Sequence, residues 1–270
     1  MPRRHLKETK EEKREMKNNL TKAFSDELRK FGLVIVNESE MSQVPPEDYS
    51  FAKQIYNNRQ VLLPLLVKIA LSLKNGAKID YDIEDQRDKG AVKQFLDNLK
   101  AKHFVNSFAL TPEGRFSIAI VADEDKRRFF RSSWAEQCFR YVIMRTVQSF
   151  CNSHGLSHKV MQNVELKREG EENLFTELDI VVQIEQKFYV FEIKSGPWIR
   201  IMQWARREEA LVHKNGAIRN IVCTIHEGIP AKIFEPQILL KLNDFDEAFE
   251  KILKEDFCVV RALEQGQRDG

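Results

Sequence analysis

Three charged residues, Asp179, Glu192 and Lys194, interrupt the two apolar runs within residues 176–196 of the 270-residue chain. Asp179 follows Leu178 and precedes a run of isoleucine and valine, while Glu192 and Lys194 flank Ile193 in a second apolar run. Charged side chains are rarely buried without a partner, because removing them from water is costly. The three charges therefore mark a candidate functional site.

The spacing of these residues predicts that they meet on a β-hairpin. Alternate residues of a strand share one face, so Glu192 and Lys194 are expected about 7 Å apart on one face, with Phe191 and Ile193 facing the core. A turn at residues 185–187 would fold the preceding strand back against this one. That antiparallel pairing predicts that Asp179 lies beside Glu192.

Two neighbouring carboxylates and a lysine suggest metal-assisted chemistry. Adjacent carboxylates repel each other unless a cation lies between them, and oxygen ligands suit Mg²⁺ or Mn²⁺. Lys194 would then orient a water molecule or offset charge in a transition state, as phosphodiester hydrolysis requires. The alternative is an exposed Glu-x-Lys pair, with Asp179 protecting an edge strand. The apolar neighbours favour the metal site.

The pattern resembles the PD-(D/E)xK, or restriction-endonuclease-like, nuclease superfamily. It consists of Glu136, then ELD ending at Asp179, then FEIKSG containing Glu192 and Lys194. The resemblance implies that Asp179, Glu192 and the backbone carbonyl of Ile193 hold Mg²⁺ or Mn²⁺. It also implies that Lys194 assists the attacking water and that Glu136 is a catalytic acid carried by a helix.

Within the superfamily, residues 123–143 (DEDKRRFFRSSWAEQCFRYVI) are similar to the segment entering the nuclease domain of CRISPR ancillary nucleases that carry a CARF sensor domain. The resemblance covers about residues 85–225. The first 48 residues are too short for a CARF domain and show no βαβ series with a phosphate-binding loop. We therefore expect a related nuclease that lacks a CARF domain and control by a cyclic oligonucleotide, and that either acts alone or is regulated by another chain.

The supporting residues have alternative interpretations. Glu136 would also suit an ion pair with Arg140, four residues later on the same helix. Gln203 and Arg206 follow the motif in helical register and would contact the scissile phosphate or a bound water. An ordinary polar helix face would explain them equally well.

The chain divides into three predicted parts. Residues 1–48 are expected to form a basic helical arm and linker, with a helix at 5–31, a short strand at 33–36 and a linker at 37–49. Residues 1–22 carry eight Lys and Arg against four Glu, which suits either contact with nucleic acid or a solvated helix.

Residues 49–128 predict a winged-helix-like module. The expected order is a helix at 49–74 broken near Pro64, a short strand, a helix at 89–102 and a hairpin with its turn at TPEG (residues 111–114). Its basic side chains, among them the candidate substrate-binding residue Lys93, would face nucleic acid. Many such modules, however, only join domains. The basic side chains are Lys93, Lys100, Lys102 and Arg115.

Residues 129–270 predict the nuclease domain. The order helix, three strands, helix, strand, helix indicates an α/β fold with a restriction-endonuclease-like mixed sheet flanked by helices. The last helix is expected at 246–254, after Asp244.

Composition limits the functional classes. Apolar residues make up 42% of the chain, its net charge is only +2, and no apolar run approaches the ~20 residues of a membrane span. Four dispersed cysteines and no secretory signal predict a cytoplasmic protein with no membrane association. We therefore expect a metal-dependent endonuclease in defence or nucleic-acid processing, acting on DNA rather than RNA, with a homodimer as the expected assembly. The alternative is a non-catalytic nucleic-acid-binding or assembly protein that retains the nuclease fold.

Overall fold

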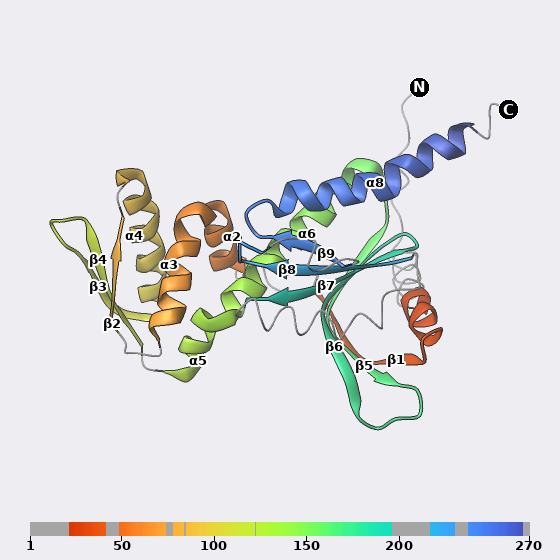
Figure 1. Cartoon of the computed structure of the whole chain (residues 1–270), viewed down its shortest axis with the longest axis horizontal. Coiled ribbons are helices and arrows are strands. Elements are labelled where there is room, and N and C mark those ends of the chain that lie inside the picture. The colour runs from red at the N-terminus through yellow and green to blue at the C-terminus, as the bar shows by residue number, and fades with distance from the viewer. Residues whose placement is uncertain are drawn as a thin grey trace.

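The computed structural model describes residues 22–41, 49–73, 78–83, 85–121, 123–195, 217–229 and 237–266. In these ranges the chain forms two β-sheets joined by one long helix (Figure 1). The N-terminal part of the predicted arm and the predicted helix that follows the FEIKSG motif lie outside the described residues.

The larger sheet has six strands in the order β1-β5-β6-β7-β8-β9. The pairs β1–β5, β5–β6 and β6–β7 are antiparallel, whereas the pairs β7–β8 and β8–β9 are parallel. This arrangement confirms the predicted α/β fold with a mixed sheet flanked by helices. The strands are β1 (Leu33–Glu40), β5 (His158–Arg168), β6 (Leu174–Ile184), β7 (Lys187–Lys194), β8 (Ile218–Thr224) and β9 (Ile238–Lys241).

Helices cover both faces of this sheet, which explains why its central strands are apolar on both sides. Tyr189, Phe191 and Ile193 pack on the face covered by α6 (Trp134–His154) and α8 (Phe245–Gly266). The alternate residues Phe188 and Val190 pack on the other face, against the helix formed by residues 22–29. The alternation predicted for β7 is therefore confirmed. The last helix is longer than the expected 246–254.

Strand β1 corrects the prediction for the N-terminal region. Residues 37–40 were expected in a linker, but β1 continues to Glu40 and pairs with β5 along the edge of the large sheet. Its register shifts at Asn37, and its polar residues bond to the neighbouring strand: Ser39 Oγ donates to the Gln162 carbonyl at 3.2 Å. An edge strand with one open side tolerates polar residues, so composition alone was misleading here.

The second module has the element order expected of a winged helix. Its three antiparallel strands lie in the order β2-β4-β3, and the β3–β4 turn closes at Gly114, whose φ of +86° suits a glycine. Whether it binds nucleic acid stays a prediction. The elements are α2 (Ser50–Asn57), α3 (Arg59–Ser72), β2 (Lys78–Asp82), α4 (Gln86–Ala101), β3 (Val105–Leu110) and β4 (Arg115–Ile120).

The predicted break at Pro64 was wrong. Helix α3 runs through Pro64, and the break between α2 and α3 lies at Asn58. Both the backbone amide and the side-chain amide of Asn58 donate to the Gln54 carbonyl, at 3.2 and 3.0 Å. Asparagine readily satisfies helix ends in this way, so the break forms six residues before the proline.

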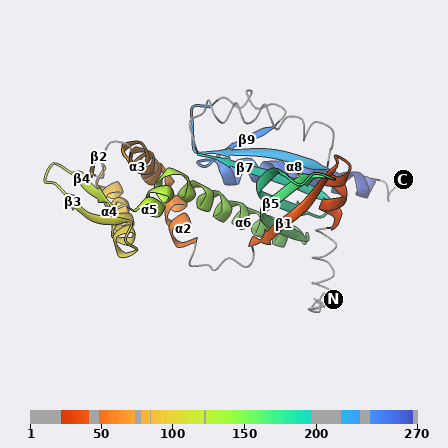
Figure 2. The ribbon, with the colours of Figure 1, turned by 90° about the horizontal axis from the view of Figure 1, so that it is seen from below.

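One long helical stretch joins the two modules. Helix α5 (Glu124–Arg128) begins after Asp123, whose side chain accepts the Lys126 amide at 3.0 Å. It continues through the π-helical segment η3 (Phe129–Ser133) into α6. Figure 2 shows this stretch crossing the molecule, with α2 beside α6. The predicted boundary at 128/129 therefore falls inside a continuous helix, and a single hydrophobic cluster extends through both modules.

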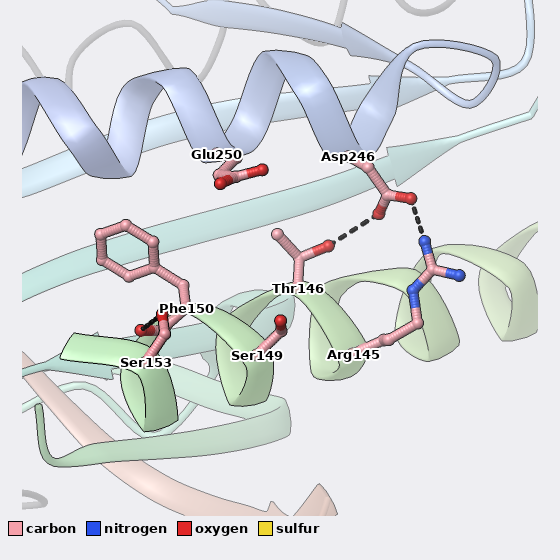
Figure 3. A pocket seen from close by; sticks show the side chains of 7 residues that line it. All are labelled: Arg145, Thr146, Ser149, Phe150, Ser153, Asp246 and Glu250. Atoms are coloured by element: carbon pink, nitrogen blue, oxygen red, sulfur yellow. Dashed lines mark hydrogen bonds and ion pairs between the residues drawn. The ribbon is translucent and has the colours of Figure 1, made fainter. Parts of the chain in front are cut away.

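Polar contacts around Asp246 fasten the two modules together. Tyr56 Oη of α2 donates to Asp246 Oδ2 at 2.7 Å, and Thr146 Oγ1 of α6 donates to Oδ1 at 2.8 Å. Arg145 also binds this carboxylate, and its guanidinium lies 4.9 Å from the centroid of the Tyr56 ring. Figure 3 shows the α6 and α8 side chains of this contact at the mouth of a pocket of about 320 Å³.

We expect Tyr56→Phe to lower the free energy of unfolding by about 1 kcal/mol, because it removes one partly buried hydrogen bond to Asp246. Burial and the bond to Asp246 raise the pKa of Tyr56 to about 12, which keeps the hydroxyl a donor at neutral pH. Urea unfolding measures the loss. Tyr81→Phe removes a hydroxyl that has no hydrogen bond to the described residues and is the control; equal losses for both variants would contradict this role for Tyr56.

Candidate metal and nucleic-acid site

The β6–β7 hairpin brings Asp179 to Glu192. Strand pairing runs from Ile184–Lys187 to Ile180–Phe191, and the same antiparallel register places Asp179 opposite Glu192. The Asp179 carboxylate accepts the backbone amide of Ile193 through Oδ2 at 2.6 Å. Its side chain thus lies against the end of β7, as the sequence predicted.

Glu192 is a buried carboxylate on this strand. Only 5% of the residue is exposed, and its Oε2 accepts from Lys194 Nζ at 2.8 Å. The Lys194 side chain remains 27% exposed, so it connects the buried carboxylate with solvent. The predicted pair is therefore neither an exposed surface pair nor a core pair. It lies at the boundary between the core and solvent.

Glu136 approaches the same cluster from the first turn of α6. Burial raises its pKa, as does the nearby charge of Asp179, while Arg140 and Lys194 lower it. No ion pair joins Glu136 and Arg140 in the described part of the chain, which argues against the simple surface-pair interpretation. Two elements distant in sequence thus place carboxylates within electrostatic reach of each other.

Arg140 instead binds Asn163, a residue that the sequence analysis missed. Arg140 Nη2 donates to Asn163 Oδ1 at 3.0 Å. Asn163 lies between the pairs Gln162–Ile180 and Val164–Leu178, which puts it opposite Asp179 across β5 and β6. Its φ of +50° is in the left-handed region, which asparagine tolerates better than most residues. The sequence signal that could have identified Asn163 is an asparagine in the middle of a strand of alternating apolar and polar residues.

Cys223 lies beside the carboxylate cluster, on the neighbouring strand β8. It is fully buried on β8, beside Ile193 in the parallel pairing of β7 and β8. Burial raises its pKa strongly, and the charges of Asp179 and Glu192 raise it further. Both carboxylates therefore concentrate negative charge at one point of the sheet.

The donor set suits a hard divalent cation. The described ranges contain no group of three or more His, Cys, Asp or Glu side chains that could surround a metal ion. Proteins commonly hold Mg²⁺ with only one or two carboxylates and leave the remaining positions to water. Asp179 and Glu192 meet that number, and their mutual repulsion is the condition that a cation relieves. The carbonyl of Ile193 as a further ligand stays a prediction.

Other predicted residues are not brought to this cluster. Lys93 lies on α4 in the other module (Figure 1), where it pairs with Asp97 at 3.0 Å. Arg115, predicted on the same basic face, pairs with Asp82 at 2.6 Å. These acidic partners weaken the expected positive surface. Gln203 and Arg206 lie outside the described residues.

Comparison with known proteins shows the fold and not the activity. No protein-family model and no curated protein sequence matches the chain. Fourteen chains of solved structures match, among them the crystal structure of protein VC1899 from Vibrio cholerae, with a TM-score of 0.50 and 17% identity. The match covers 86% of this chain but only 60% of VC1899. Of the helices described, none is long and apolar enough to cross a membrane.

Proposed function

We propose that this chain is a metal-dependent nuclease that hydrolyses phosphodiester bonds, with DNA as the expected polymer. The observation that carries the proposal is the arrangement at the end of β7. Asp179 and Glu192 lie opposite each other, Lys194 contacts Glu192 at 2.8 Å, and Glu136 lies within electrostatic reach. A buried carboxylate clustered with two half-buried carboxylates and a partly exposed lysine is typical of functional sites.

Each residue has a defined task in this proposal. Asp179 and Glu192 would hold the ion, and the Ile193 amide fixes the Asp179 carboxylate in place. A bound Mg²⁺ or Mn²⁺ supplies a Lewis acid and lowers the pKa of water. Lys194 is close enough to the carboxylates to orient that water and to stabilise negative charge that develops on the phosphate. Glu136 would orient water from the opposite side.

The buried, free thiols Cys138, Cys151 and Cys223 support a reducing compartment, so the proposal places the protein in the cytoplasm. The expected homodimer and a role in defence or nucleic-acid processing belong to the proposal as well.

Single-stranded and double-stranded DNA and RNA, incubated with the full chain in Mn²⁺, Mg²⁺ or EDTA, test this function. We expect cleavage with either metal and none in EDTA. The double variant Glu192→Ala/Lys194→Ala, purified in the same way, shows whether the activity belongs to this chain. Salt-sensitive binding without cleavage of any substrate would instead support the non-catalytic nucleic-acid-binding protein.

A further inference from the structure

A second pocket, of about 440 Å³, lies where the two modules meet. Helix α2, the turn after α4, η3, α6 and β5 all contribute to its lining. Its volume lies within the range of about 300–1,000 Å³ that is usual for ligand sites. Nothing in the cluster around Asp179 uses this pocket.

Three phenylalanine rings form an aromatic wall. The ring centroid of Phe51 lies 5.7 Å from those of both Phe104 and Phe129, and the centroids of Phe104 and Phe129 are 4.6 Å apart. Lysines accompany this wall: Lys102 Nζ is 5.0 Å from the Phe51 centroid, and Lys126 Nζ is 4.4 Å from that of Phe104. Aromatic rings beside cations are the combination with which proteins stack bases and hold the adjoining phosphates.

Polar atoms on the opposite side of the pocket lack partners. Arg140 Nε and Gln162 Oε1 are buried and make no hydrogen bond with the described residues, and both residues line the pocket. Leaving buried polar atoms unsatisfied costs about 1–3 kcal/mol each. One is a donor and the other an acceptor, so a ligand that satisfies both must itself carry an acceptor and a donor, as the edge of a nucleobase does.

Arg140 connects this pocket with the candidate metal site. Its Nη2 binds Asn163, which lies opposite Asp179, and its charge lowers the pKa of Glu136. Arg140 therefore lines the pocket and also contacts the strand beside Asp179. The pocket and the carboxylate cluster thus share Arg140 as a common neighbour.

We propose that this pocket binds one unpaired nucleobase of the substrate strand, next to the scissile phosphate. The inference rests on the proposed nuclease function and deepens it, because a base in this pocket must be outside a duplex. The base packs against the phenylalanine rings when Lys102 and Lys126 move from the ring faces to the adjoining phosphates. Its edge bonds the side chains of Arg140 and Gln162, which must turn toward the pocket to meet it. The substrate is therefore single-stranded or locally unpaired.

Abasic scanning tests the site. Single-stranded oligonucleotides of one sequence, each with one abasic nucleotide, are cleaved by the full chain in Mn²⁺. We expect one position near the cut at which losing the base lowers kcat/KM about 10-fold or more. Gln162→Leu and Lys102→Ala should each cut the intact strand more slowly, and Gln162→Leu should abolish most of the abasic penalty. Lys53→Ala, an equal charge change on an exposed position of α2, should behave like wild type.

A binding measurement separates this inference from the nuclease proposal. With 2-aminopurine at the sensitive position, or at each position in turn if no cleavage is found, fluorescence should change on binding in EDTA, and much less with Gln162→Leu. Cleavage by wild type with no abasic-sensitive position would overturn the base site and leave the nuclease standing. Absence of cleavage together with a fluorescence change that depends on Gln162 would overturn the nuclease proposal and leave the base site standing. A fluorescence change that Gln162→Leu retains in full would also overturn the base site.

Discussion

Replacing Glu192 by Ala is expected to abolish both Mn²⁺ binding and cleavage, whereas replacing Lys194 by Ala should slow cleavage and leave Mn²⁺ bound. Glu192 is a buried oxygen donor opposite Asp179, so its loss removes half of the proposed carboxylate pair. A metal supplies several kcal/mol of transition-state stabilisation, which corresponds to a loss of about 1,000-fold or more in kcat.

Lys194 has a different place in the same site. Its ammonium contacts Glu192 but carries no lone pair for a cation at neutral pH, so its removal leaves both carboxylates in place. Losing one charged donor from a preorganised site typically reduces kcat about 10²–10³-fold. We therefore expect Lys194→Ala to lose activity to that extent with little change in Mn²⁺ affinity.

Electron paramagnetic resonance of free Mn²⁺ measures binding, and single-turnover cleavage measures the chemical step. Glu227→Ala, in the exposed segment after β8, is the control for removing an acidic side chain and should retain both properties. Thermal melting of each variant confirms that it is folded. Undiminished Mn²⁺-dependent cleavage by both Glu192→Ala and Lys194→Ala would refute the assignment of this site.

Replacing Asp256 by Asn is expected to cost about 2–3 kcal/mol in the free energy of unfolding. Asp256 lies on α8, is 4% exposed, and accepts from Lys187 Nζ at 2.9 Å, Tyr189 Oη at 3.0 Å and Arg219 Nη2 at 2.7 Å. Breaking a fully buried pair costs about 3–5 kcal/mol. The cost is smaller here because the Lys187 and Arg219 side chains are partly exposed and regain water.

This contribution should depend on pH in a defined direction. Burial alone would raise the pKa of Asp256, but hydrogen bonds from Arg219, Lys187 and Tyr189 outweigh burial and hold that pKa below its usual value. A depressed folded-state pKa stabilises the protein above the unfolded pKa of about 3.9, and the benefit is lost as pH falls through the folded-state pKa. The stability gap between wild type and Asp256→Asn should therefore narrow below about pH 4.

Urea unfolding at pH 7 and at decreasing pH measures both effects. Glu255→Gln removes the same charge from the neighbouring position of α8, which faces solvent, and should change stability by less than about 0.5 kcal/mol. An Asp256→Asn variant as stable as Glu255→Gln at pH 7 would contradict the role of this network in fastening α8 to the sheet.

The geometry around Asp179 was predictable because it depends on local rules. Strand alternation places Glu192 and Lys194 on one face, and the position of one tight turn sets the register that brings Asp179 opposite Glu192. Glu136 required knowledge of helix packing, which the sequence supplied only through a resemblance. The chemical role of these residues stays a prediction.

Features that depend on long-range packing were not predictable in this way. Strand β1 is polar and reads locally as a linker, and only its pairing with β5 shows otherwise. Pro64 was a strong local signal, but the contacts of Asn58 determined where the helix breaks. The bond between Arg140 and Asn163 joins residues 23 positions apart through two different elements, and no spacing rule predicts it. The pocket between the modules arises from the same kind of packing.

The π-helical segment Phe129–Ser133 fixes the direction in which the smaller module points. A π-turn contains one more residue than an α-turn, and each residue of an α-helix corresponds to about 100° of rotation. All that precedes η3 is therefore turned about the helix axis relative to an uninterrupted helix. Inserting or deleting one residue at this point would rotate the whole smaller module relative to the large sheet. A change of one residue in length at η3 is thus a simple route to a different angle between the two modules, without redesign of either surface.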